Sequence, residues 1–278
     1  MDQDREVTKV VELFEKDIRE YDRQSSKGNQ LKLFSNNIWY KADYTGYEGL
    51  TEHVVSKLLA CSTLEEREFI CYDTEEIKYK YMIYKGCSSE NFLPEGWSLI
   101  TLERLFQQVY QKSLNKAIYS ISDYENRIKF LVEQTIRITG LTDFGAYISK
   151  LLTIDAFFLN EDRHTHNIAV LMDTEGKYHY CPIFDNGAAL LSDTTMDYPL
   201  TVPFNVLLEN VRSKTFCTSF DEQLDIAERL YGQHIHFHFS EKEIENLCLK
   251  ESYYSDEIKE RVKDVLMNQR RKYQYLFR

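Results

Sequence analysis

The chain has 278 residues, of which 43% are hydrophobic and 28% charged, a composition that excludes a disordered segment and allows a sizeable core. Its formal net charge of −11 opposes direct binding to nucleic acid, because a phosphate backbone would be repelled. The cysteines form no Cys-x-x-Cys pair, residues 1–24 hold no apolar secretory segment, and no apolar run is long enough to span a membrane. We therefore expect a cytoplasmic protein with reduced thiols and no membrane partner.

The first third of the chain is typical of a small lobe that combines strands with one or two helices. Apolar residues at helical spacing predict an amphipathic helix over residues 7–21. The next predicted elements are strands at 31–34 and 38–41, a helix at 47–59, and strands at 68–73 and 77–86. These elements predict a mostly antiparallel sheet in an N-terminal lobe that ends at residue 92.

The remainder, residues 93–278, is predicted to form a larger and mostly helical lobe. Helical spacing runs through 102–114, and Ser122 with Glu125 has the spacing of a capping box for a long helix that Gly140 ends. Thr142 is the expected cap of a third helix. The later elements are strands at 168–172 and 178–183 and helices at 206–210, 220–230, 241–249 and 256–275. Ser240 and Glu243 have the spacing of a capping box for the helix at 241–249. The predicted fold class is α+β, with a small lobe followed by a helical one.

A polar loop follows the third of these helices. Residues 159–168 read Leu-Asn-Glu-Asp-Arg-His-Thr-His-Asn-Ile, and loops of this kind, held by a rigid helix, often carry function. Asp162 and Asn167 have the spacing of a kinase catalytic loop, in which the Asp accepts a hydroxyl proton and the Asn binds Mg²⁺. Asp185 follows at the end of the predicted strand pair. We therefore predict Asp162 as the general base and Asn167 and Asp185 as ligands of Mg²⁺.

Each of these patterns also has a simpler interpretation. An Asp and an Asn at this spacing occur together by chance in many proteins, and Asp185-Asn186-Gly187 is a common turn sequence. The histidines of the polar loop, and three more that alternate with apolar residues over 234–238, could bind a metal. Such histidines more often orient their neighbours or cover a half-buried strand or loop, so we expect no zinc site.

The polar loop and the later aspartate resemble those of the HipA-like kinases. That family has Asn-x-Asp-Arg-His-x-x-Asn and then an Asp that ends a short hairpin, and the matching residues here are Asn160, Asp162, Arg163, His164, Asn167 and Asp185. The resemblance implies a bilobal protein-kinase-like fold and an ATP- and Mg²⁺-dependent transfer of phosphate to serine or threonine of a protein substrate. The chain resembles the compact, stand-alone members, which lack the extra N-terminal subdomain of the HipA toxins.

The same resemblance assigns residues to the nucleotide. The run from residue 28 to residue 32 is similar to the Gly-x-Gln-x-Lys phosphate loop of the family, and the residues expected to bind the cofactor are Gly28, Asn29, Gln30 and Lys32. Lys41 is expected to contact the ATP phosphates, with Glu52, or else Glu48, as its partner on the following helix. His164 is assigned to the same nucleotide site. By analogy of fold, backbone groups at 82–86 are expected to bind adenine.

Regulation is predicted at two places. Ser25 and Ser26 precede the phosphate loop, where an added phosphate would repel ATP, and HipA-like kinases modify themselves in this loop. Thr194 and Thr195 lie where an activation segment is expected. The resemblance is compatible with a toxin that has a separate antitoxin and with a regulatory kinase that has another protein partner.

Two other functions remain open. A small-molecule kinase of the aminoglycoside or choline type also has an Asp and an Asn five residues apart in its catalytic loop. A nucleotide-binding pseudokinase would act as an interaction module without transferring phosphate. The Asp-Arg-His run and the Gly-x-Gln-x-Lys loop favour the HipA-like kinase, and the joint presence of Asp162, Asn167 and Asp185 argues against a pseudokinase.

Overall fold

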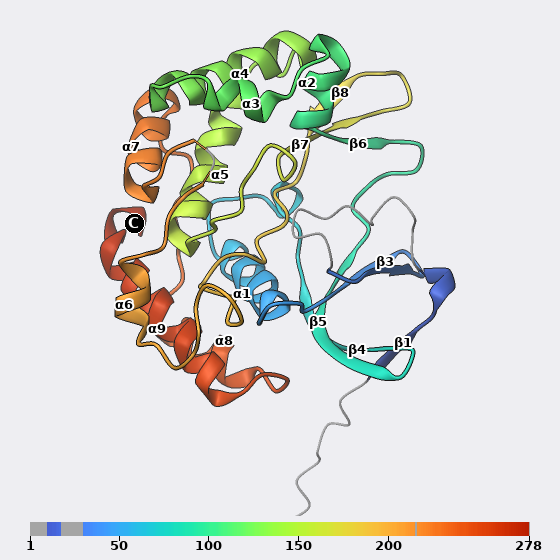
Figure 1. Cartoon of the computed structure of the whole chain (residues 1–278), viewed down its shortest axis with the longest axis vertical. Helices are drawn as coiled ribbons and strands as arrows, with labels where there is room; N and C mark the ends of the chain where they lie inside the picture. Colours follow the sequence, from blue (N-terminus) through green and yellow to red (C-terminus); the bar gives the residue numbers. More distant parts are fainter. Residues whose placement is uncertain (1–9, 18–29, 215, 278) are drawn as a thin grey trace, which may run out of the picture.

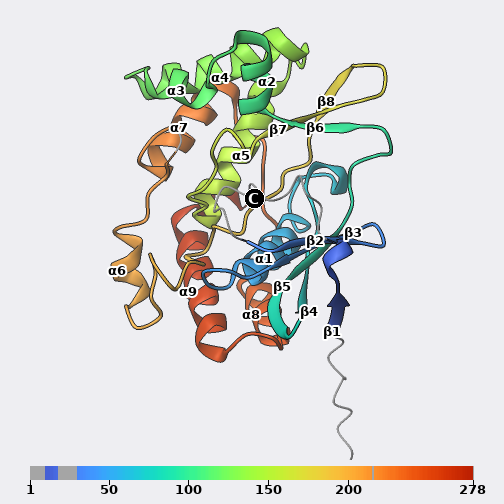
Figure 2. The same ribbon diagram turned by 45° about the vertical axis from the view of Figure 1, so that its right-hand side comes forward.

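The computed structural model describes residues 10–17, 30–214 and 216–277, which fold into two lobes of unequal size (Figure 1). The smaller lobe contains a five-stranded sheet in the order β1-β4-β5-β3-β2, with helix α1 packed against it. The larger lobe is mostly helical and contains a three-stranded sheet in the order β6-β7-β8 (Figure 2). The α+β fold with a small sheet lobe and a large helical lobe is therefore confirmed.

The smaller lobe is built mainly from antiparallel neighbours. Its elements are β1 (Val10–Leu13), η1 (Glu15–Asp17), β2 (Lys32–Ser35), β3 (Ile38–Ala42), α1 (Glu48–Leu59), η3 (Glu66–Glu68), β4 (Asp73–Tyr79) and β5 (Met82–Glu90). All strand pairs are antiparallel except β1 with β4, which is parallel. The strands at 31–34 and 38–41 and the helix at 47–59 are thus confirmed within a residue or two.

Three predictions in this lobe are wrong. The described part of the expected helix 7–21 forms β1 and a short 3-10 turn, because Val11 and Leu13 pack with Ile77 of β4 and long-range pairing overrides the helical spacing. Residues 68–73 are not a strand, since β4 begins only at Asp73. The single strand expected at 77–86 is a hairpin that turns at Lys80. Lys80 has a φ of 56°, in the left-handed region, and a lysine does not usually predict such a turn.

The larger lobe follows the expected order of elements, except that the strand β6 was not predicted. They are β6 (Ser98–Thr101), α2 (Leu102–Tyr110), α3 (Leu114–Tyr119), α4 (Tyr124–Thr139), α5 (Phe144–Phe158), β7 (Ala169–Met172), β8 (Tyr178–Tyr180), α6 (Phe204–Leu208), α7 (Phe220–Tyr231), α8 (Glu241–Lys250), α9 (Asp256–Lys272) and η4 (Gln274–Leu276). No helix in the described ranges is long and apolar enough to cross a bilayer.

Several helix ends differ from the predictions. The helix expected at 102–114 is two helices, because Gln111 adopts a left-handed conformation and Ser113 caps a new one. The cap of α4 is Asp123, whose carboxylate accepts the N–H of Asn126, and not Ser122. Position 143, and not Thr142, precedes α5. Gly140 does end α4, with a φ of 74°, and the capping box predicted for the helix at 241–249 is present.

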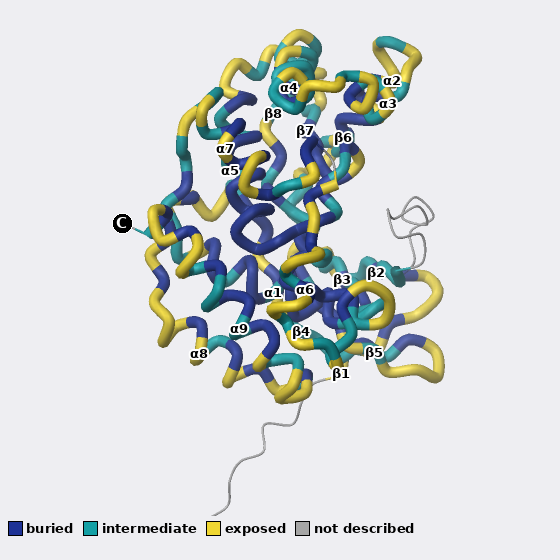
Figure 3. Tube along the Cα trace, turned by 60° about the vertical axis from the view of Figure 1, so that its left-hand side comes forward, coloured by how far each residue is buried: buried dark blue, intermediate teal, exposed yellow. Residues whose placement is uncertain are grey.

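Helix α5 is the rigid support of the polar loop. Twelve of its residues are buried, and it crosses the centre of the larger lobe, where it packs against α7 and α9 (Figure 3). The helix ends at Phe158 because Leu159 takes a left-handed conformation with a φ of 59°. The polar loop, residues 159–168, therefore begins from a fixed point in the core.

Helix α1 lies unusually close to the sheet of the smaller lobe. A Cβ atom added at Gly49 of α1 would lie 2.4 Å from the carbonyl carbon of Gly86 in β5, and one added at Gly86 would lie 2.1 Å from the carbonyl oxygen of Lys41. Only glycine allows the backbones to approach in this way. The close contact brings Glu52 of α1 within reach of Lys41 on β3.

Gly49→Ala is therefore expected to lower the free energy of unfolding by about 1–3 kcal/mol, because the added methyl group overpacks the contact between α1 and β5. Chemical denaturation of the purified variant measures this change. Gly140→Ala is the control variant, because a Cβ atom at that position would meet nothing within 4 Å. It should lower the free energy of unfolding only by the strain of the left-handed backbone, about 1 kcal/mol. A Gly49 variant that is as stable as wild type would contradict the close packing.

Candidate active site

The polar loop is held in place by one buried guanidinium, that of Arg163. Its Nε lies 3.1 Å from both carboxylate oxygens of Asp155, in the last turn of α5. Nη1 donates to the carbonyl oxygens of Asn167 and Phe184 at 3.2 and 2.7 Å, and Nη2 donates to Oδ1 of Asn186 at 2.6 Å. Burial alone would lower the pKa of Arg163, but Asp155 and Asp185 more than offset it and raise that pKa. Arg163 thus joins α5, the polar loop and both neighbours of Asp185.

Asp162 and Asn167 are hydrogen-bonded to each other across the polar loop. The side-chain amide nitrogen of Asn167 donates to the backbone oxygen of Asp162 at 2.8 Å, as does the backbone N–H of His164 at 2.9 Å. Because the amide nitrogen of Asn167 is the donor in this contact, its Oδ1 is the atom available to a cation. The side chain of Asp162 is 28% exposed, so its carboxylate can meet a substrate.

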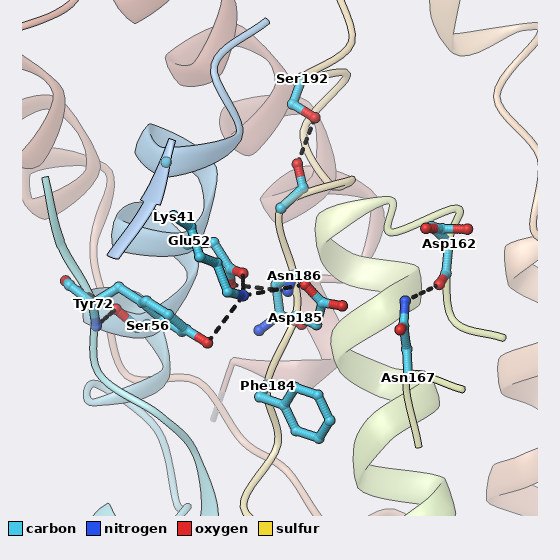
Figure 4. A network of polar contacts seen from close by, with 12 residues as sticks. Lys41, Glu52, Ser56, Tyr72, Asp162, Asn167, Phe184, Asp185, Asn186 and Ser192 are labelled. Carbon is cyan, nitrogen blue, oxygen red and sulfur yellow. Dashed lines mark hydrogen bonds and ion pairs between the residues drawn. The ribbon is translucent and has the colours of Figure 1, made fainter. Parts of the chain in front are cut away.

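Lys41 lies between two carboxylates from different lobes (Figure 4). Its Nζ donates to Oε1 of Glu52 at 2.7 Å and to Oδ1 of Asp185 at 3.2 Å, with the Tyr72 hydroxyl at 3.5 Å. The other oxygen of Glu52 accepts the N–H of Asn186 at 2.9 Å. Glu52 therefore contacts both the lysine of the small lobe and the chain segment that carries Asp185.

Glu52, and not Glu48, is thus the carboxylate that pairs with Lys41. The carboxylate of Glu48 instead accepts hydrogen bonds from the backbone N–H groups of Tyr44, Thr45 and Gly46. These bonds order the loop between β3 and α1.

The charges around Asp185 keep it ionised. Burial would raise its pKa, but Lys41, Lys32 and Arg163 lower the pKa well below its usual range. Lys41 is affected in the opposite sense, because Glu52, Tyr72 and Asp185 more than offset the burial that would lower its pKa, and the pKa is raised well above its ordinary value. Asp185 also has a φ of 62°, a strained conformation that these contacts hold.

One pocket is lined by six of the fourteen site residues predicted from the sequence. It lies between the lobes and is lined by Gln30, Lys32, Tyr44, Glu48, Glu52, Asp162, Asn167, Asp185, Gly187 and Ala188. His164 is not part of this lining, although its Nε2 lies 3.8 Å from Oδ1 of Asp162. Gly28, Asn29, Ser25 and Ser26 lie outside the described residues, so their assignments stay predictions.

The segment expected to bind adenine, residues 82–86, does not form the link between the lobes. Residues 82–86 belong to β5, where they pair with β4, and Gly86 also pairs with Ala42 of β3. The chain leaves the small lobe only after Glu90 and enters β6 at Ser98. The link between the lobes is therefore residues 91–97, which follow the predicted segment.

Thr194 and Thr195 lie in a segment that is hydrogen-bonded to the small lobe. Oγ1 of Thr195 donates to the carbonyl oxygen of Thr45 at 2.7 Å, and Oγ1 of Thr194 lies 3.5 Å from the same oxygen. The N–H of Tyr47 donates to Ser192 in the same region. A phosphate on Thr195 would replace the hydroxyl that makes its bond, but whether either threonine is phosphorylated stays a prediction.

Three further residues of the site carry no prediction from the sequence. Asp155 could have been predicted from the sequence, because a single carboxylate inside the apolar helix 144–158 needs a buried partner. Tyr72 and Asn186 could not have been predicted, because Tyr72 stands in an irregular segment and Asn186 in an ordinary turn sequence.

The donor set suits magnesium. A carboxylate and an amide oxygen are hard ligands, and Mg²⁺ in nucleotide enzymes is often held by one or two such groups together with phosphate oxygens. Within the described ranges no three His, Cys, Asp or Glu residues gather as a cage for another metal. The imidazoles at 234, 236 and 238 lie beside the buried side chains of Ile235, Phe237 and Phe239, as expected of a half-buried segment.

The fold is shared with a solved kinase. The structure is similar to that of a Helicobacter pylori proinflammatory kinase, CtkA, with a TM-score of 0.55 and 18% sequence identity over 87% of this chain and 90% of that chain. At this identity the likeness concerns the fold alone. No protein-family model and no curated protein matches the sequence. The kinase-like bilobal fold expected from the polar loop is thereby confirmed.

Proposed function

We propose that this chain is a HipA-like serine/threonine protein kinase, which transfers the γ-phosphoryl group of ATP to a hydroxyl of a protein. One observation carries the proposal. Asp162, Asn167 and Asp185 line a single pocket between the lobes, and the Lys41–Glu52 pair contacts Asp185 at that pocket. A base, two hard oxygen ligands and a paired lysine are the groups that phosphoryl transfer requires.

Asn167 and Asp185 are the residues that would hold Mg²⁺. When bound there, the ion would neutralise the negative charge of the phosphates. The depressed pKa of Asp185 supports this role, because its carboxylate is ionised at any physiological pH.

The reaction then depends on residues that the fold has already aligned. The Asp162 carboxylate accepts the proton of the acceptor hydroxyl, and the oxygen of that hydroxyl forms a bond to the γ-phosphorus. The bond from this phosphorus to the bridging oxygen breaks, and ADP leaves with the electron pair. Lys41 holds a positive charge beside the phosphates, and Glu52 keeps its ammonium group in place.

The choice of a protein acceptor rests on the resemblance of the Asp-Arg-His run to the HipA-like family. We extend it to a cytoplasmic kinase that modifies itself and acts either as a regulatory enzyme or as a toxin with a separate antitoxin. A protein partner is part of this proposal, whereas the acidic charge still opposes direct binding to nucleic acid.

Incubation with γ-labelled ATP and MgCl₂ tests the proposal. The wild-type chain should label itself on serine or threonine, and mass spectrometry should find the phosphate at Ser25, Ser26, Thr194 or Thr195. Asp185→Ala should abolish labelling. Labelling of an aminoglycoside or choline, with none on protein, would favour a small-molecule kinase. Binding of ATP and Mg²⁺ in a thermal shift, without transfer to any acceptor, would instead favour a pseudokinase.

A further inference from the structure

The two lobes also touch outside the pocket. The connection between α8 and α9 reaches the small lobe (Figure 2). There the Tyr254 hydroxyl donates to Oδ2 of Asp43 at 2.8 Å. Close by, Oγ1 of Thr74 on β4 donates to Oε2 of Glu251 at 2.9 Å. Tyr254 is 5% exposed and Glu251 7%, so both side chains are buried in this contact.

The same aspartate also holds the first turn of α1. Oδ1 of Asp43 accepts the N–H of Gly49, the second residue of that helix, at 2.6 Å. Asp43 directly follows β3, the strand that carries Lys41. One carboxylate thus joins β3, the start of α1 and the larger lobe.

Asp43 depends on these donors. Burial raises the pKa of its carboxyl to about 7, and Glu48 acts in the same direction, whereas the Gly49 N–H, the Tyr254 hydroxyl and Lys85 lower the pKa. A carboxyl that has lost most of its water needs protein partners in its place. The ring of Tyr254 is itself held by Lys85 of β5, whose Nζ lies 5.3 Å from the ring centroid.

We infer that the Asp43–Tyr254 contact is a latch through which the larger lobe positions α1, and that Tyr254 is a positioning residue for the Lys41–Glu52 pair. Glu52 lies one turn after Gly49 on α1, so a shift of the first turn moves the carboxylate that contacts Lys41 and Asn186. The latch acts beside the covalent link at 91–97, the Lys41–Asp185 contact across the pocket, and the bonds of Thr45 and Tyr47 to residues 192–195. Its catalytic consequence rests on the proposed function, but its structural consequence does not.

Tyr254→Phe isolates the latch, because it removes one oxygen and keeps the ring. Tyr273→Phe is a matched control: Tyr273 is 4% exposed, and its hydroxyl donates to Oδ1 of Asp221 at 2.6 Å within the larger lobe. Hydrogen exchange followed by mass spectrometry should show exchange in α1 about five- to tenfold faster in Tyr254→Phe than in wild type, the effect of losing one hydrogen bond. In Tyr273→Phe the exchange of α1 should match wild type.

Kinetics provide a second readout. Tyr254→Phe should lower kcat/KM for ATP by about five- to tenfold, whereas Tyr273→Phe should leave it unchanged. In a Glu52→Gln background, adding Tyr254→Phe should cause no further loss, because the latch acts through Glu52 and the two changes cannot add.

Two results would overturn the latch. One is exchange in α1 that Tyr254→Phe leaves unchanged or that Tyr273→Phe raises equally. The other is a loss of kcat/KM on adding Tyr254→Phe that is the same in the Glu52→Gln background as in wild type. If wild type transfers no phosphate at all, the proposed function fails, and the exchange experiment still decides the latch by itself.

Discussion

Asp162→Asn is expected to slow phosphoryl transfer by about 10²- to 10⁴-fold while leaving the fold and the affinity for ATP unchanged. The amide has the shape of the carboxylate but cannot accept the proton of the acceptor hydroxyl. The bonds that order the polar loop at this position survive, since Asn167 and His164 donate to the backbone oxygen of Asp162, which the substitution keeps. Initial rates at saturating ATP measure the first effect and titration calorimetry the second.

The control is Asp264→Asn on α9, a half-buried aspartate outside the lining of the pocket, which should retain wild-type rates. Near-normal transfer by Asp162→Asn would mean that another group takes the proton, and the assignment of the general base would be wrong. If the variant loses both ATP binding and phosphoryl transfer, the substitution disturbs the pocket itself.

Arg163→Met is expected to lower the free energy of unfolding by about 3–5 kcal/mol and to abolish activity. The substitution leaves the carboxylate of Asp155 buried without its cation and removes the donors to Phe184 and Asn186. Denaturant titration measures the stability. Arg229→Met should cost less than about 1 kcal/mol, because the ion pair of Arg229 with Glu125 is exposed.

A double variant separates the two roles of Arg163. Arg163→Met with Asp155→Leu removes both charges, so much of the lost stability should return. Activity should not return, because the guanidinium that hydrogen-bonds the polar loop to the segment around Asp185 is still missing. Recovery of activity in the double variant would show that Arg163 only neutralises Asp155.

Local patterns were sufficient where the partners are close in the chain. Asp162 and Asn167 lie in one short loop, and their mutual contact follows from its five-residue spacing. Lys41 and Glu52 are 11 residues apart on a strand and the following helix, so their pairing was also within reach. The capping residues Gly140 and Ser240 act within a single helical turn, and both were predicted correctly.

Long-range pairing decided the remainder. The spacing of residues 7–21 suits a helix, yet Val10–Leu13 forms a strand because β4, more than 60 residues later, offers a parallel partner. Arg163 was part of the motif, but its acceptors come from three separate segments. Asp43 and Tyr254 are 211 residues apart, and neither belongs to a recognisable pattern. A sequence pattern records which chemistry a short segment can perform, whereas contacts between distant segments depend on how the whole chain packs, which no local period encodes.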